Sequence, residues 1–137
     1  MEEKEVNLEK QANIIRQTIV KLVYGASSGH PGGSLSIADI ITFLYFKELK
    51  NINLKKPKNP DRDRVVLSKG HCAPALYAAL KEKGFFDESN MQNFRQVSGI
   101  LQGHPDMKHI PGIDMTTGSL GQGLSAAVRN EFGWKIR

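Results

Sequence analysis

Apolar residues recur at three- and four-residue steps near the start of the chain, which is the spacing that places them on one face of an α-helix. The stripe comprises Leu8, Ala12, Ile15, Ile19, Leu22 and Ala26. It predicts a helix over 8–24, with Asn7 as a suitable N-cap because its side chain can accept a hydrogen bond from the first turn. Gly25 is expected to end this helix.

The next apolar run, over 37–49, is hydrophobic nearly all round. That pattern favours a buried helix, although its β-branched and aromatic content keeps a strand as the alternative. Ser36 and Asp39 resemble a capping box at its start. We expect a loop over 27–35 before it, and another over 51–63, which contains two prolines.

Residues 64–68, Arg-Val-Val-Leu-Ser, form a short apolar run that is typical of a buried parallel strand. A lone buried strand would leave its backbone polar groups unpaired. Either the domain is mostly helical, or residues outside this chain complete a sheet.

Three further helices and one long loop are predicted in the second half of the chain. One helix has Pro74 in its first turn and Gly84 after its end. A short helix follows Asp87, its predicted N-cap. Residues 96–117 read as a long loop, and loops of that length are often functional. A final helix starts near Leu120.

Composition limits the class of protein. With 137 residues the chain is at most one domain, and its hydrophobic fraction of 39% excludes general disorder. The net charge of +5 suits an anionic, phosphorylated substrate. The basic stretch over 55–69 raises the hypothesis of nucleic-acid binding, but it lacks interleaved aromatic residues, so a solvated loop is the preferred interpretation.

A single cysteine, Cys72, excludes an intramolecular disulfide. The charged residues 1–5 do not resemble a signal segment, and the apolar run 37–46 is too short to span a bilayer. These features predict a cytoplasmic protein that binds neither membrane nor nucleic acid.

Three of the four histidines follow a glycine, each in a different predicted loop: His30, His71 and His104. Glycine permits close approach of a ligand, and the adjacent imidazole can bind it or carry a proton. His30 is also compatible with a surface turn. His71 follows the predicted strand, where α/β sheets bind ligands. His109 is interpreted as an exposed loop residue, because no metal-ligand pattern accompanies it.

Residues 116–123 form a glycine-rich entry into the last predicted helix. Backbone N–H groups at such a helix start can bind a diphosphate. The segment is neither a P-loop nor a dinucleotide-binding fingerprint, and a tight turn before a closely packed helix is the alternative. Together with the histidine loops it predicts one polar small-molecule site.

Four motifs, taken in order, resemble the N-terminal part of transketolase, most closely the short type with separate N- and C-terminal subunits. They lie at 28–36, 61–71, 103–105 and 116–125. The resemblance implies that 1–137 is the N-terminal part of an α/β thiamine diphosphate-binding domain, incomplete and helix-rich, with a parallel sheet. Residues 129–137 do not fit the family's pattern and form an atypical tail.

The resemblance also implies an activity: transfer of a two-carbon ketol unit between sugar phosphates with thiamine diphosphate. His30 is expected to contact the carbonyl and hydroxyl end of the donor. His71 would lie beside substrate and the cofactor's diphosphate, and His104 would bind substrate and carry protons. The residues expected to line the cofactor are Gly118, Ser119 and Leu120.

Two expectations follow from departures from the family. The Gly-Asp-Gly motif and later asparagine that hold Mg²⁺ in the family do not occur before Arg137, so no metal ligand is assigned in this chain. The tail at 129–137 resembles a truncation or frameshift product.

Because the family's cofactor lies between subunits, we expect a homodimer or a hetero-oligomer with a transketolase C-terminal subunit. The alternative is a non-catalytic remnant or partner-binding fragment.

Overall fold

The computed structural model describes residues 6–52, 54–57 and 59–135, with side chains to Arg129. The terminal residues 1–5 and 136–137, and Lys58 of the basic stretch, lie outside the described residues. The elements are α1 Leu8–Ala26, α2 Pro31–Leu35, α3 Ala38–Phe43, the π-helical turn η1 Leu44–Glu48, the 3₁₀ turn η2 Gly70–Cys72, α4 Ala73–Glu82, α5 Glu88–Gln92 and α6 Gln122–Lys135.

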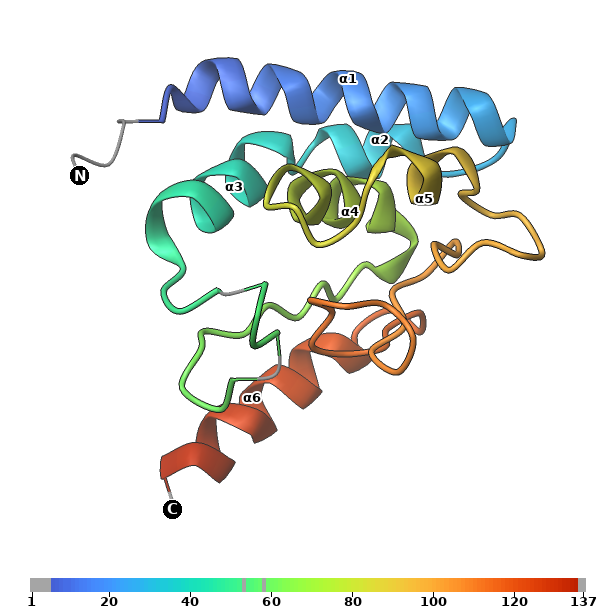
Figure 1. The fold of residues 1–137 in the computed structure, drawn as a ribbon. Coiled ribbons are helices and arrows are strands. Elements are labelled where there is room, and N and C mark those ends of the chain that lie inside the picture. Colours follow the sequence, from blue (N-terminus) through green and yellow to red (C-terminus); the bar gives the residue numbers. More distant parts are fainter. Residues whose placement is uncertain (1–5, 53, 58, 136–137) are drawn as a thin grey trace.

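The helices α1 to α5 form the packed part of the molecule (Figure 1). Helix α1 lies across α2, α3 and α4, whereas α6 lies on the far side of the long loops. None of the helices within the described residues combines the length and hydropathy needed to cross a bilayer.

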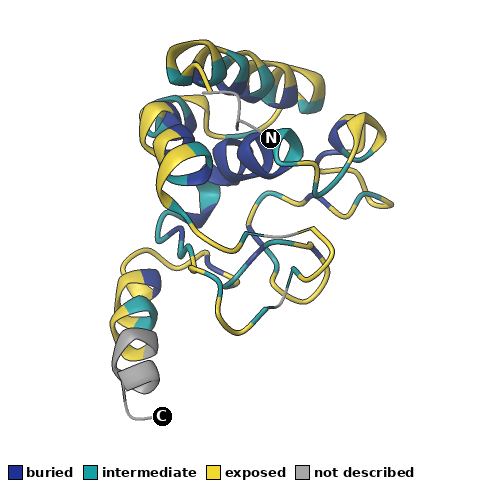
Figure 2. Cartoon of the chain, turned by 60° about the vertical axis from the view of Figure 1, so that its left-hand side comes forward, coloured by how far each residue is buried: buried dark blue, intermediate teal, exposed yellow. Residues whose placement is uncertain are grey.

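The hydrophobic core is centred on α4, which is buried from Ala73 to Leu80 (Figure 2). Four alanines in this run let neighbouring helices approach closely, because their side chains are small. The buried residues of α1 are Ala12, Ile15, Ile19 and Leu22, all on the predicted apolar stripe. The described part of α6 is mostly exposed by comparison.

Helix α1 confirms its predicted start but not its predicted end. Asn7 Oδ1 accepts the Lys10 N–H at 2.9 Å. Gly25 lies inside the helix, and the expectation that it ends the helix is wrong. Ser27 takes the left-handed conformation instead, with φ of 48°. Its N–H and that of the next residue bond the carbonyls of Tyr24 and Val23 at 3.0 and 3.3 Å, which closes the last turn.

The 37–49 run is helical, so the strand alternative is wrong. It is not buried all round, because Ile40 and Phe43 are 61% and 47% exposed. The predicted capping box is also wrong: α3 begins after Ile37 without a side-chain cap, and Ser36 Oγ donates to Gly33 O at 2.9 Å. The preceding loop contains a short helix, α2, with proline in its first turn.

The strand expected at 64–68 is not formed, and the described residues contain no β-strand. A sheet needs backbone hydrogen bonds between extended segments, and here side chains make those bonds. The Val65 N–H donates to Asp114 Oδ2 at 2.8 Å, and Leu67 O accepts from Thr117 Oγ1 at 2.7 Å. Residues 65–67 and 114–117 therefore lie side by side in the same direction, joined by side chains and not by the backbone hydrogen bonds of a sheet.

The elements of the second half follow their predictions. Pro74 lies in the first turn of α4, and Gly84 follows its end with φ of +83°. Asp87 caps α5 through a capping box with Asn90. Residues 96–117 contain no helix or strand. Helix α6 begins at Gln122, close to the expected position.

Candidate functional site

His30 and His71 lie against each other although 41 positions of sequence separate them. Their ring centroids are 4.9 Å apart in an edge-on arrangement. His30 precedes the first turn of α2, and His71 lies in η2. Two of the three predicted histidine loops therefore meet in space.

Lys69 fixes this meeting point. Its Nζ donates to Gly33 O at 2.8 Å and to Ser36 Oγ at 2.9 Å, which ties the α2 segment to the turn before η2. Gly33 is required there, because a Cβ would lie 2.5 Å from Cys72 Sγ. Lys69 was not singled out from the sequence as a functional residue.

His104 also interacts electrostatically with His71. The pKa of His71 is lowered from its ordinary value, first by desolvation and then by the neighbouring charges of His30, His104 and Lys69. Desolvation and nearby cations both disfavour the imidazolium form. His71 is therefore neutral at pH 7 and able to accept a proton or a hydrogen bond.

An open cavity of about 390 Å³ adjoins His104. It is lined by His104 and by residues 115–119, 122 and 123. A Cβ on Gly118 would lie 3.6 Å from His104 Cδ2, so the glycine-rich segment and the histidine loop are in contact range. The start of α6 borders this cavity, and a helix N-terminus favours anionic groups.

Two glycines allow the close packing behind the cavity. A Cβ on Gly70 would lie 2.4 Å from Thr117 O, and a Cβ on Gly123 would lie 2.6 Å from Ser68 Cα. Both contacts are with backbone, which cannot move aside easily. These positions bring the 116–118 segment and α6 onto the turn that carries His71.

Of the residues expected at the cofactor, two line the cavity, whereas His71 and Leu120 are not among its lining residues. Gly118 and Ser119 line the cavity. Leu120 follows them and is 70% exposed, outside the lining residues. A lining made of glycine, a small hydroxyl and a helix start fits an anionic ligand that approaches the backbone.

His109 lies apart from this cluster, whereas Cys72 follows His71 in η2 and packs against Gly33. His109 is exposed, and its Nδ1 lies 2.5 Å from Asp106 Oδ2. Cys72 is fully buried, and burial raises the pKa of its thiol, which is typical of a cysteine that packs in a core. Within the described ranges, no three His, Cys, Asp or Glu side chains gather in a group that could hold a metal.

The basic stretch is only partly a solvated loop. Lys55, Lys56 and Arg64 are exposed, but the Arg62 side chain is 7% exposed and forms an ion pair with Asp114. Lys69 is also engaged, as described above. The interpretation of the whole stretch as a solvated loop is therefore wrong for these two residues.

A family model described as the thiamine diphosphate binding domain of transketolase matches residues 8–133 of the chain. The chain belongs to the transketolase family. The matched region ends within the segment 129–137, and it includes all four motifs.

Two curated relatives are named as transketolase subunits. The 6-deoxy-6-sulfo-D-fructose transketolase subunit SqwG of Clostridium sp. (strain MSTE9) is 48% identical over 128 residues, covering 93% of this chain and 46% of that protein. One of the subunits of the apulose-4-phosphate transketolase of Phocaeicola vulgatus is 44% identical over 121 residues, covering 88% and 42%. The chain thus spans less than half the length of these relatives.

The fold is also that of solved transketolases. The structure of transketolase from Leishmania mexicana superposes with a TM-score of 0.85 at 38% identity, covering 90% of this chain and 18% of that chain. The helix-rich arrangement around α4 is therefore a part of the transketolase fold.

Tyr77 is a further residue of this transketolase domain that the sequence patterns do not identify. Tyr77 lies in the apolar run of α4, and its hydroxyl approaches the backbone at His104. A tyrosine among alanines and leucines has the pattern of a core residue, so nothing local marks it out.

Proposed function

We propose that this chain is the thiamine diphosphate-binding, N-terminal section of a transketolase that transfers a two-carbon ketol unit between sugar phosphates. It would act with further residues or with a C-terminal partner subunit, in a homodimer or a hetero-oligomer. The observation that carries the proposal is the convergence of three histidine loops with a cavity bordered by Gly118 and Ser119. The two relatives named as transketolase subunits support it.

The residues proposed to hold the cofactor are His71, Gly118, Ser119 and Leu120. Gly118 and Ser119 would offer backbone groups near the start of α6, and exposed Leu120 would offer an apolar surface. When bound, thiamine diphosphate supplies the nucleophilic carbon and the electron sink that ketol transfer requires.

The three histidines are proposed as the catalytic residues. His30 and His104 are exposed and would bind the hydroxyl and carbonyl groups of the sugar. His71, whose pKa is lowered by desolvation, would stay neutral and accept a hydrogen bond or proton near pH 7. The net charge of +5 favours approach of a phosphorylated sugar.

Mg²⁺ is proposed as the counter-ion of the diphosphate, and no residue of this chain is proposed as its ligand. Hard oxygen ligands would be needed for that ion. We also propose a cytoplasmic location. The relatives are named for a sulfonated and a phosphorylated sugar, so we propose a role in pentose phosphate metabolism or a related sugar pathway.

The test is a titration of thiamine diphosphate with Mg²⁺, by calorimetry, with and without a transketolase C-terminal subunit. Ketol transfer from a ketose phosphate to an aldose phosphate is measured on the same samples. We expect saturable binding in the presence of the subunit. In the active assembly, His104→Gln should lower turnover by about 10²–10⁴-fold, whereas His109→Gln, the matched control in the same loop, should leave it unchanged.

Absence of binding in both conditions would overturn the proposal. Binding without ketol transfer would favour the alternative of a non-catalytic, partner-binding fragment.

A further inference from the structure

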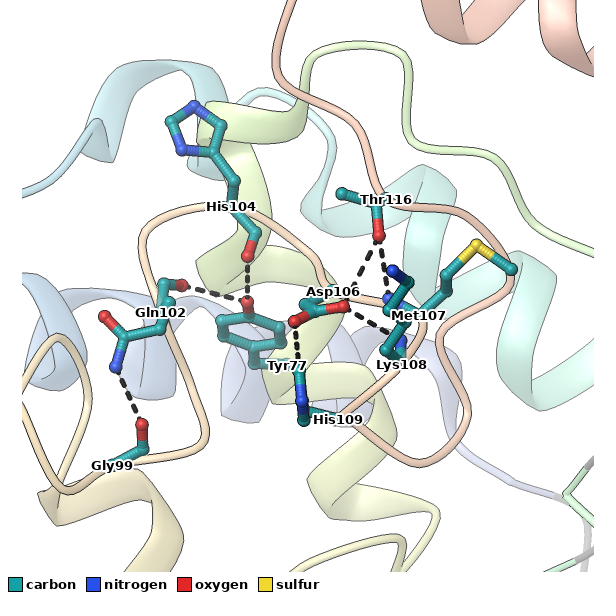
Figure 3. A network of polar contacts seen from close by, with 9 residues as sticks. All are labelled: Tyr77, Gly99, Gln102, His104, Asp106, Met107, Lys108, His109 and Thr116. Carbon is teal, nitrogen blue, oxygen red and sulfur yellow. Dashed lines mark hydrogen bonds and ion pairs between the residues drawn. The ribbon is translucent and has the colours of Figure 1, made fainter.

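The hydroxyl of Tyr77 faces the backbone of the loop that carries Gln102 and His104 (Figure 3). It is 2.9 Å from the carbonyl oxygens of both Gln102 and His104. Tyr77 is fully buried on α4, the central helix of the core. A single core hydroxyl therefore contacts the loop backbone on both sides of Gly103.

Aromatic packing fixes the Tyr77 ring. Phe86 and Phe94 pack edge-on against it, with centroids 6.4 and 6.1 Å away. Burial, assisted by the charge of Asp106, raises the pKa of Tyr77 well above its ordinary value. The hydroxyl is therefore protonated, and remains a hydrogen-bond donor, throughout the neutral pH range.

The loop holds His104 by its backbone and leaves its ring free for the cavity. Figure 3 shows the His104 carbonyl facing the Tyr77 hydroxyl and the imidazole directed away from it. Pro105, the next residue, is fully buried. On the other side, Gln102 Nε2 donates to Gln96 O and Gly99 O at 2.9 and 2.7 Å. The backbone is thus fixed before and after the imidazole.

We infer that Tyr77 is a positioning residue that holds the 102–104 backbone so that the His104 imidazole faces Gly118 and the cavity. Gly103 explains the need for such an anchor, because a residue without a side chain leaves the backbone free to adopt many conformations. What His104 does in the cavity rests on the proposed function, whereas its placement is a property of this chain alone.

The first arm of the test uses the 137-residue chain with labelled histidines, since four histidine signals are expected from it. Tyr77→Phe removes the hydroxyl and keeps the ring packing. We expect the His104 imidazole signal to shift and broaden while those of His30, His71 and His109 stay in place. Tyr45→Phe is the matched control, because Tyr45 is also buried but lies beside Arg62 and Asp114.

The second arm measures ketol transfer in the assembly that makes the wild-type chain active. Tyr77→Phe should lower kcat by about tenfold or more, because small displacements of a catalytic group are costly, with the affinity for thiamine diphosphate unchanged within about twofold. A folded Tyr77→Phe chain with an unmoved His104 signal would overturn the inference, as would equal shifts of all four signals. An inactive wild-type assembly would overturn the proposed function instead, and the first arm would still decide the role of Tyr77.

Discussion

The ionisation of His71 is set by the residues that the fold brings against it. Desolvation lowers its pKa first, and the charge of His30 is the second cause. These effects disfavour the imidazolium form, so His71 stays neutral and able to accept a hydrogen bond near pH 7. This property exists only in the folded chain, because the three histidines are far apart in sequence.

Replacing His30 by Gln should raise the pKa of His71, since the interaction with His30 that lowers it is removed while desolvation remains. A histidine-resolved NMR titration measures this shift, with His109→Gln as the control that leaves His71 unchanged. An unchanged or lower pKa of His71 in the His30→Gln chain would contradict the expected coupling.

The same lowered pKa has a consequence for stability. Unfolded His71 binds a proton near pH 6.5, whereas the folded chain binds it at lower pH. Below about pH 6.5 the unfolded state therefore binds more protons, and the free energy of unfolding falls as the pH decreases. His71→Gln should reduce this slope, which urea unfolding at a series of pH values measures. An unchanged slope would mean that His71 titrates alike in the folded and unfolded chain.

The chemistry of single residues was readable from the sequence only where its signal is local. The Gly-His pairs marked His30, His71 and His104 because glycine and histidine are adjacent. Lys69 was missed as a functional residue because its partners Gly33 and Ser36 lie 36 and 33 positions away. Tyr77 was missed for the same reason, since its acceptors are 25 and 27 positions away.

At the scale of elements, two helical glycines test what packing adds to helix propensity. Gly25 lies in the last turn of α1, where a Cβ would meet nothing within 4 Å. Gly123 lies in the first turn of α6, where a Cβ would lie 2.6 Å from Ser68 Cα. Helix propensity alone favours alanine at both positions.

Gly25→Ala should stabilise the chain by about 0.5–1 kcal/mol, because alanine loses less conformational entropy in a helix. Gly123→Ala should destabilise it by about 1–3 kcal/mol, because the added methyl group overpacks against backbone. Urea unfolding of the two variants measures both values. A stabilising Gly123→Ala would show that α6 does not pack on the Ser68 turn as described.

Elements were predictable where caps and periodicity agree. Asn7, Pro74 and Asp87 act on neighbouring residues, so their helices followed from the sequence. The strand at 64–68 did not, because strand formation depends on a distant partner, and Asp114 and Thr117 side chains occupy the backbone groups of this segment. The parallel sheet therefore remains a proposal.

At the scale of the whole molecule, a buried ion pair joins the basic loop to the segment that leads into the cavity. The side chains of Arg62 and Asp114 are 7% and 4% exposed and form an ion pair. Asp114 also accepts the Val65 N–H at 2.8 Å, and Arg62 Nε has no hydrogen-bond partner among the described residues. Because no backbone hydrogen bonds of a sheet join residues 62–65 to residues 114–117 in the described structure, the Arg62–Asp114 pair holds these two segments together.

Asp114→Asn should therefore destabilise the chain by about 3–5 kcal/mol, because Arg62 is left as a buried, unpaired charge. The amide oxygen can still accept the Val65 N–H, so the loss reports mainly on charge.

The double variant Arg62→Met/Asp114→Asn should be more stable than Asp114→Asn, because no charge is then buried. Chemical unfolding at pH 7 of the wild-type chain, Asp114→Asn, Arg62→Met and the double variant gives the coupling energy. The exposed pair Arg16 and Asp39, with side chains 39% and 73% exposed, is the matched control and should couple by less than about 1 kcal/mol. Equal coupling energies for the two pairs would mean that water reaches Arg62 and Asp114. The two segments beside the cavity would then have to be held together by other interactions.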